Sequence, residues 1–307
     1  ASPGAADWPF ASSAYATVSL RPYLIISYAV PSAPVITSNG GGTSASINTA
    51  ENATAVTTLT ATDMDSTAAE LSYSIVGGAD AGRFSINATT GALRFLTAPN
   101  YELPTDADSN NVYDVTVQVS DGFLSDTQTI AVTVTPLNDN TPVITSNGGG
   151  ATAAISLAEN TLLVTTVNAG DADLPTSTLT YTIIGGADSA RFSLNSSTGQ
   201  LSFVAAPNYE APSDAGANNV YDVTVQVSDG TYTDTQAIAV TLTAVNDNTP
   251  VISSNGGGAT AAISLAENTL PVTTVTASDA DLPTSTLTYA IIGGADSARF
   301  SLNSSTG

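Results

Sequence analysis

The sequence predicts an all-β protein made of tandem seven-stranded Greek-key β-sandwiches that follow one another in an elongated rod. Three observations predict this class: an internal repeat as long as a domain, short stretches that alternate apolar and polar residues, and turn residues between those stretches. No stretch with the period of an α-helix competes with this pattern.

The internal repeat has a period of 108 residues, because the tripeptide Pro-Val-Ile begins at Pro34, Pro142 and Pro250. Residues 140–199 differ from residues 248–307 at only five positions. A period of this length is a whole domain rather than a solenoid unit, so we expect two complete copies and a third that stops early. The predicted domains are an N-terminal apolar segment (1–33), copy one (34–141), copy two (142–249) and incomplete copy three (250–307).

Within a copy, apolar and polar residues alternate with a period of two, as in strands that have one buried face. At 113–120 a Tyr and three Val residues alternate with polar residues, and at 129–134 Ile and Val alternate with Thr and Ala. Glycines at 40–42, 77–78 and 91 supply the positive φ angles that tight turns need. About seven such strands in about 100 residues are typical of a two-sheet sandwich.

The charge balance excludes several classes of function. The chain has five Arg, no Lys and 27 acidic residues, which gives a net charge of −22 and argues against nucleic acid and anionic lipid as partners. It has no Cys and no His, so disulfides, thiolate zinc sites and Cys- or His-dependent nucleophiles are impossible. Oxygen atoms are the metal ligands that remain.

The apolar runs are too short for membrane insertion. The longest, Tyr23–Val30, falls well below the ~20 residues that cross a bilayer. The chain begins at Ala1 with small residues and no cationic segment, which suits a secreted protein after removal of a signal peptide. We therefore expect a secreted or cell-surface, extracellular protein.

Six short boxes recur in the same order and at the repeat period. An Ala-Glu-Asn box and an Asp-x-Asp box come first, followed by a Phe-Ser-Ile-Asn-x-x-Thr-Gly turn at 84–91. Asn-Tyr-Glu, Val-Ser-Asp-Gly and Asn-Asp-Asn-Thr-Pro complete the series. The acidic positions are Glu51, Glu159 and Glu267; Asp63/Asp65, Asp171/Asp173 and Asp279/Asp281; Glu102 and Glu210; and Asp121 and Asp229. With these boxes, residues 34–307 resemble bacterial cadherin-like repeats of the cadherin repeat family.

The resemblance implies Ca²⁺ bound where one copy meets the next. Calcium takes six to eight oxygen ligands in flexible geometry, so residues from two domain ends and a linker can share it. At the first junction the implied ligands are Glu51, Asn100, Glu102, Asn138, Asp139, Asn140, Asp171, Asp173 and Asp229. At the second they are Glu159, Asn208, Glu210, Asn246, Asp247, Asn248, Asp279 and Asp281. Without metal, such crowded carboxylates repel, so we expect raised pKa values or splayed domain ends.

Three departures from the family pattern weaken the expected sites. Pro136 and Ala244 replace linker acids, and Asn100 and Asn208 replace a common Asp, so we expect affinity toward the ~10⁻⁴ to 10⁻³ M range. The last Asp of the second junction would lie beyond residue 307. At the start of copy one, Asp63, Asp65 and Asp121 follow a linker, 29–33, without acids, so we expect no full calcium cluster there.

The N-terminal segment suggests an alternative. Its strand-like runs at 14–20 and 23–30 resemble the strands that copy three lacks. Either the chain is a portion of a longer tandem protein, or residues 14–30 of one molecule complete copy three of the next. The second case gives a head-to-tail homopolymer, a filament formed by strand addition.

The leading functional prediction is cell adhesion by a rod whose linkers are stiffened by calcium, and it follows from the resemblance. The expected partner is a protein, either a second copy or another surface protein. A structural fibre subunit and a carbohydrate-binding surface module are the alternatives. We do not expect an enzyme, because the carboxylates recur as junction ligands and the sequence shows no sign of an aromatic-lined cleft.

Overall fold

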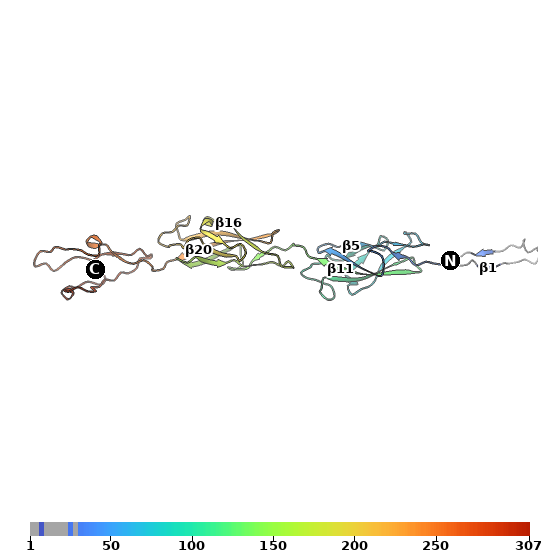
Figure 1. Ribbon diagram of the computed structural model, residues 1–307, viewed down its shortest axis with the longest axis horizontal. Helices are drawn as coiled ribbons and strands as arrows, with labels where there is room; N and C mark the ends of the chain where they lie inside the picture. The colour runs from blue at the N-terminus through green and yellow to red at the C-terminus, as the bar shows by residue number, and fades with distance from the viewer. Residues whose placement is uncertain (1–5, 9–23, 27–29) are drawn as a thin grey trace, which may run out of the picture. The chain divides into compact units, whose positions relative to one another are not determined.

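The computed structural model describes residues 6–8, 24–26 and 30–307, and these are almost entirely strands and loops (Figure 1). The predicted all-β sandwich class is confirmed. β1 (Ala6–Trp8) pairs antiparallel with β2 (Leu24–Ile26), which falls in the predicted run 23–30, whereas the run 14–20 lies outside the described residues. Among the described residues, no helix is long and apolar enough to cross a membrane.

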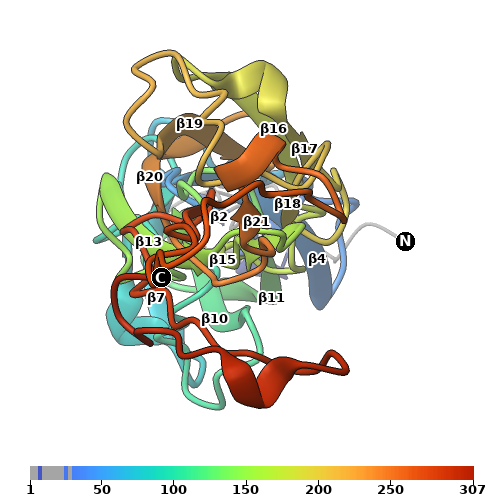
Figure 2. The same cartoon turned by 90° about the vertical axis from the view of Figure 1, so that its left-hand side faces the viewer.

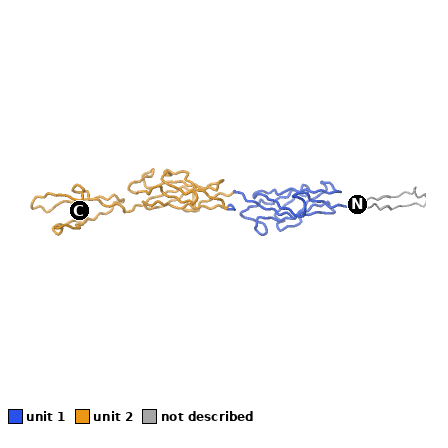
Figure 3. Tube along the Cα trace, viewed as in Figure 1, with its two compact units in different colours: residues 1–138, 173–175 blue, residues 139–172, 176–307 orange. Residues whose placement is uncertain are grey.

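Two compact units divide the chain (Figure 3). The first comprises residues 1–138 and 173–175, and the second comprises residues 139–172 and 176–307. Copy two and copy three therefore share one unit, and their junction lies inside it. The domain boundaries expected from the repeat stay a prediction.

The first unit contains a sandwich of two sheets. One sheet has the strand order β4-β11-β10-β7 and the other β5-β9-β8, while β3 and β6 form a short separate pair. β11 runs parallel to β4 and antiparallel to β10, with Val115 opposite Ile130. The elements are β3 (Val35–Ile36), β4 (Ser44–Ala50), β5 (Ala55–Thr58), β6 (Ala61–Thr62), β7 (Ser72–Gly77), the 3₁₀ turn η2 (Ala81–Arg83), β8 (Phe84–Ile86), β9 (Ala92–Phe95), β10 (Val112–Ser120) and β11 (Ser125–Thr135).

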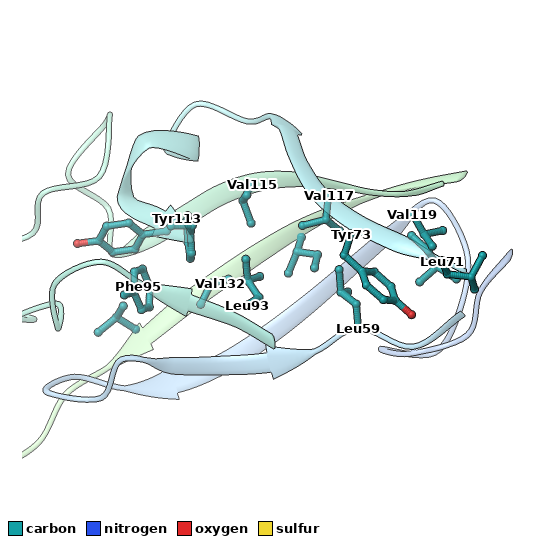
Figure 4. Close-up of a cluster of buried hydrophobic side chains, with 14 residues drawn as sticks. Leu59, Leu71, Tyr73, Leu93, Phe95, Tyr113, Val115, Val117, Val119 and Val132 are labelled. Carbon is teal, nitrogen blue, oxygen red and sulfur yellow. The ribbon is translucent and has the colours of Figure 1, made fainter. Parts of the chain in front are cut away.

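The core of this sandwich consists of the apolar residues that the alternation predicted. Tyr113, Val115, Val117 and Val119 of β10 are all buried, and they lie with Leu93 and Phe95 between the two sheets (Figure 4). The Phe95 ring meets the Tyr113 ring edge to face, with centroids 5.1 Å apart. Full burial of a Val, Leu or Phe side chain contributes roughly 1.5–3 kcal/mol, so this layer of buried side chains is the main source of stability.

One glycine is required where a turn passes close to β10. Gly78 has φ +105°, and a Cβ there would lie 2.3 Å from the carbonyl oxygen of Asp114. Any other residue would clash with backbone, which cannot move without breaking the sheet. Of the two glycines predicted to supply positive φ at 77–78, Gly78 does so, whereas Gly77 does not because it is the last residue of β7.

The second unit repeats this sandwich in copy two. Its sheets have the orders β13-β20-β19-β16 and β14-β18-β17, and all of these strands except β14 are labelled in Figure 2. The elements are β12 (Val143–Ile144), β13 (Thr152–Ala158), β14 (Leu163–Thr166), β15 (Ala169–Gly170), β16 (Thr180–Gly185), η3 (Ser189–Arg191), β17 (Phe192–Leu194), β18 (Gln200–Phe203), β19 (Val220–Ser228) and β20 (Thr233–Thr243).

Copy three, in the same unit, has little sheet. Its elements are β21 (Val251–Ile252), η4 (Ser254–Gly256), β22 (Ala277–Ser278) and η5 (Ser297–Arg299). Phe300 is 54% exposed, whereas its counterpart in copy two, Phe192, is 6% exposed. Apolar side chains such as Ile291 and Leu302 line an open groove of about 1560 Å³.

Candidate metal centre

The site begins with Glu159, a carboxylate buried at the end of β13. The Glu159 side chain is 2% exposed. Its Oε1 accepts a hydrogen bond from the Val245 backbone N–H and its Oε2 accepts one from the Tyr209 backbone N–H, both at 2.7 Å. These bonds satisfy the buried charge and fix the carboxylate between the end of β20 and the Asn-Tyr-Glu box.

Two further carboxylates gather around Glu159. Glu210 and Asp247 each place a carboxylate oxygen such that the three residues' oxygens lie within 4.8 Å of one another. The Asn160 side-chain amide donates to Asp247 Oδ2 at 2.6 Å, which ties the linker to the Ala-Glu-Asn box. Sequence reasoning did not assign Asn160 to the site, although the Asn of that box was the available signal.

Copy three supplies the Asp-x-Asp box, and Asp281 is its buried member at 2% exposure. Asp281 Oδ1 accepts hydrogen bonds from the backbone N–H groups of Asp247 (3.3 Å) and Asn248 (3.0 Å). Asp279 Oδ1 accepts from the Asp281 N–H at 3.1 Å, and Glu210 accepts from the Leu282 N–H at 3.2 Å. These hydrogen bonds join copy two, the linker and copy three at the second junction.

Two predicted ligands at this junction use their side chains differently. Asn208 Oδ1 accepts a hydrogen bond from the Ala211 N–H at 2.8 Å, so this oxygen closes a local turn. Asn246 directs its side-chain NH₂ to Ser285 Oγ at 3.4 Å. Neither contact brings these two side chains to a carboxylate.

The donor set fits calcium. Glu210 Oε2 and Asp281 Oδ2 are buried and have no hydrogen-bond partner among the described residues. A buried carboxylate oxygen without a partner is costly, and a hard cation is the group that satisfies several of them together. Glu159, Glu210, Asp247 and Asp281 would hold the ion. The one ion pair among the described residues, Arg299–Asp296, lies elsewhere in copy three, so no described Arg neutralises these four carboxylates.

Hydrogen bonding tunes the ionisation of Asp281. The side-chain hydrogen bond from Asn248 lowers the pKa of the Asp281 carboxyl, and burial opposes this effect. The carboxyl therefore stays ionised, as a metal ligand must be. The sequence led us to expect either raised pKa values or splayed domain ends where carboxylates crowd together. At Asp281 the pKa is lowered rather than raised, because neutral donors stabilise the charged form.

The first junction repeats these features within each unit. In the first unit Glu51 is buried, accepts hydrogen bonds from the Tyr101 and Leu137 N–H groups, and lies with an oxygen within 4.8 Å of one from Glu102. Glu102 accepts from the Leu174 N–H at 3.2 Å.

The remaining first-junction residues are divided between the two units. Asp173, in the first unit, is 2% exposed, and Asn138 ends the main segment of that unit. In the second unit, oxygens of Asp171 and Asp229 lie within 4.8 Å of each other. Asn100 Oδ1 accepts from the Leu103 N–H at 2.8 Å, and the Asn140 NH₂ donates to Asp139 Oδ1 at 3.0 Å.

A third carboxylate group lies at the start of copy one. Oxygens of Asp63, Asp65 and Asp121 come within 4.8 Å of one another. The Ser32 hydroxyl donates to Asp63 Oδ1 at 2.7 Å and also to Asp65, and this hydrogen bond lowers the pKa of Asp63. Sequence reasoning missed Ser32, which has no acidic neighbour to draw attention to it. No acid from the preceding linker joins this group among residues 30–33.

Comparison with known proteins agrees with this architecture. Residues 43–135 match the family model described as the cadherin domain. Human Protocadherin Fat 1 is 34% identical over 195 residues, which cover 60% of this chain and 4% of that protein. The chain thus spans a small part of the length of this relative.

Solved structures show the same fold. Mouse cadherin-23 EC22-24 matches with a TM-score of 0.61 and 20% identity, covering 90% of this chain and 86% of that chain. The extracellular cadherin domains 3-6 of Protocadherin Gamma B2 match with a TM-score of 0.53 and 24% identity, covering 73% and 56%. These findings support the cadherin domain family for this chain, and its β-sandwich fold is that of cadherin ectodomain repeats. The bacterial kind of repeat stays a prediction, since the relative and the mouse structure are from animals.

Proposed function

We propose that this chain is part of an extracellular calcium-binding rod of cadherin-like repeats that acts in cell adhesion, at the cell surface or after secretion. The observation that carries the proposal is the group formed by Glu159, Glu210 and Asp247 beside the buried Asp281. Its partner is a protein, either a second copy or another surface protein. No enzymatic activity is proposed.

Calcium would act here by its charge and its coordination number. The ion would be held by Glu159 and Glu210 from copy two, Asp247 from the linker and Asp281 from copy three, all within the second unit. Because these ligands come from separate stretches of chain, ion binding opposes their mutual repulsion and restricts the linker. A restricted linker stiffens a chain of repeats.

A charge-removing variant tests the proposal. Glu210→Gln keeps the shape of the side chain but removes one negative charge from the group, so we expect calcium affinity at the second junction to fall about tenfold, by isothermal titration calorimetry. Glu267→Gln is the matched control, because Glu267 is the counterpart of Glu159 in copy three but belongs to none of the three-carboxylate groups in the described chain. Calorimetry that shows no calcium binding to the parent chain would refute the proposal.

A structural fibre is the second candidate, and the open groove of copy three favours it. Apolar side chains such as Leu270 and Ile292 are exposed, and strands added from another molecule could bury them. Residues 14–30 of a second copy would supply those strands. Deleting residues 1–30 should abolish filaments seen by electron microscopy. Filaments that form equally well without these residues would exclude strand exchange. The carbohydrate-binding alternative stays a prediction without a supporting feature.

A further inference from the structure

Asn248 occupies an unusual place in the second junction, because its side-chain NH₂ lies between two carboxylates. It donates to Asp247 Oδ1 at 3.0 Å and to Asp281 Oδ1 at 2.8 Å. The first acceptor belongs to the linker and the second to copy three. One neutral amide therefore bridges two negative charges that would otherwise repel each other, and it does so with hydrogen atoms rather than with its oxygen.

The backbone strengthens this bridge. The N–H groups of Asp247 and Asn248 both point at the same oxygen, Asp281 Oδ1. Asp281 is nearly fully buried. Its other oxygen, Oδ2, is also buried and accepts no hydrogen bond from the described residues. One oxygen of Asp281 is thus saturated by the linker, and the other stays open.

We propose that Asn248 is a neutral latch that holds the linker against copy three in the absence of calcium and competes with the ion for Asp247 and Asp281. The competing part of this inference rests on the proposed calcium function. A cation that draws on Asp247 Oδ1 or Asp281 Oδ1 must displace amide hydrogens from that oxygen, because like partial charges repel. The latch therefore keeps the ion-free junction ordered and weakens calcium binding.

An independent example of the same device lies in the first unit. Ser32 occupies the position in copy one that Asn248 occupies in copy three, two repeat periods later. Its N–H donates to Asp65 at 3.2 Å and its hydroxyl donates to Asp63 at 2.7 Å and to Asp65. Although the residue type differs, a neutral donor ties down the Asp-x-Asp box in both places. In copies one and three, therefore, the donor role rather than the amide oxygen is what the two residues at this position have in common.

The latch is tested by hydrogen exchange of the full chain with Asn248→Ala. In chelator we expect the amides of Asp247, Asn248 and Leu282 to exchange at least tenfold faster than in the parent, because the bridge is lost. In saturating CaCl₂ their protection should return to the parent level. Calorimetry with CaCl₂ should show affinity at the second junction rising about threefold.

Two matched variants sharpen the test. Asn246→Ala removes an amide two residues away whose NH₂ group donates to Ser285 Oγ rather than to a carboxylate, so its exchange and affinity should match the parent. Asn248→Ser keeps a donor of the kind seen at Ser32 and should retain part of the protection. Unchanged exchange of Asn248→Ala in chelator would overturn the latch. If the parent binds no calcium but Asn248→Ala still exchanges faster, the latch stands, while the competition and the proposed calcium function fall.

Discussion

The start of copy one and the start of copy three carry the same Asp-x-Asp box in different settings. Both boxes are tied down by a neutral donor, Ser32 in one case and Asn248 in the other. Of these two boxes, the one in copy three also has an acidic linker residue, Asp247, that lies with Glu159 and Glu210 of the preceding copy. The difference indicates that the box and its neutral donor are a structural feature that copies one and three share, whereas the proposed cation binding depends on the acids that the preceding segment adds.

Removing calcium should produce the largest difference in stability and hydrogen exchange between the start of copy one and the start of copy three. At a free calcium concentration of 100 times Kd, the ion stabilises the folded state by about 2.7 kcal/mol, which corresponds to a Tm increase of about 5 to 10 °C. Chelation should therefore lower the Tm and increase exchange at residues 246–282. Exchange at Ser32 and Asp65 should not change. Equal increases in both regions would contradict the distinction.

Introducing the linker residues of the second junction before copy one tests whether copy one lacks a cation site because it lacks these residues. Val30 and Pro31 occupy the positions of Asn246 and Asp247. The double variant Val30→Asn/Pro31→Asp should add one weak calcium site, with Kd of about 10⁻⁴ to 10⁻³ M, beside Asp63 and Asp65. Calorimetry would detect it as additional bound calcium, with Val30→Ser/Pro31→Ala as the control. An unchanged stoichiometry would mean that the preceding copy's glutamates are indispensable.

Acid should have the smallest effect, and a similar one in both regions. The pKa values of Asp63 and Asp281 both lie below the ordinary Asp value because neutral side chains donate hydrogen bonds to the ionised form. A lowered folded-state pKa means that the stabilisation is present above the unfolded-state pKa of about 3.9 and is lost as pH falls through the folded value. Carboxyl-carbon NMR titration in chelator should show both groups titrating below pH 3.9. Asn248→Ala should raise the Asp281 value and leave Asp63 unchanged.

The sequence predicted the sandwich well because strand alternation records which face is buried. Tyr113, Val115 and Val117 were assigned to one face from their spacing, and all three lie in the core. The junction residues were grouped by their order in the repeat, and the structure brings Glu159, Glu210 and Asp247 together. What their spacing could not show is which atom of each side chain faces the site.

The sequence by itself determined the period, the alternation and the restriction to oxygen ligands, because these depend only on residue type and position along the chain. Tertiary structure alone decided that Asn248 bridges two carboxylates as a donor and that Ser32 donates to the Asp-x-Asp box of copy one. The physical reason is distance along the chain. Asn248 and Asp281 are 33 residues apart, and Ser32 and Asp63 are 31 apart, so their hydrogen bonds exist only once the sheets have brought these segments together.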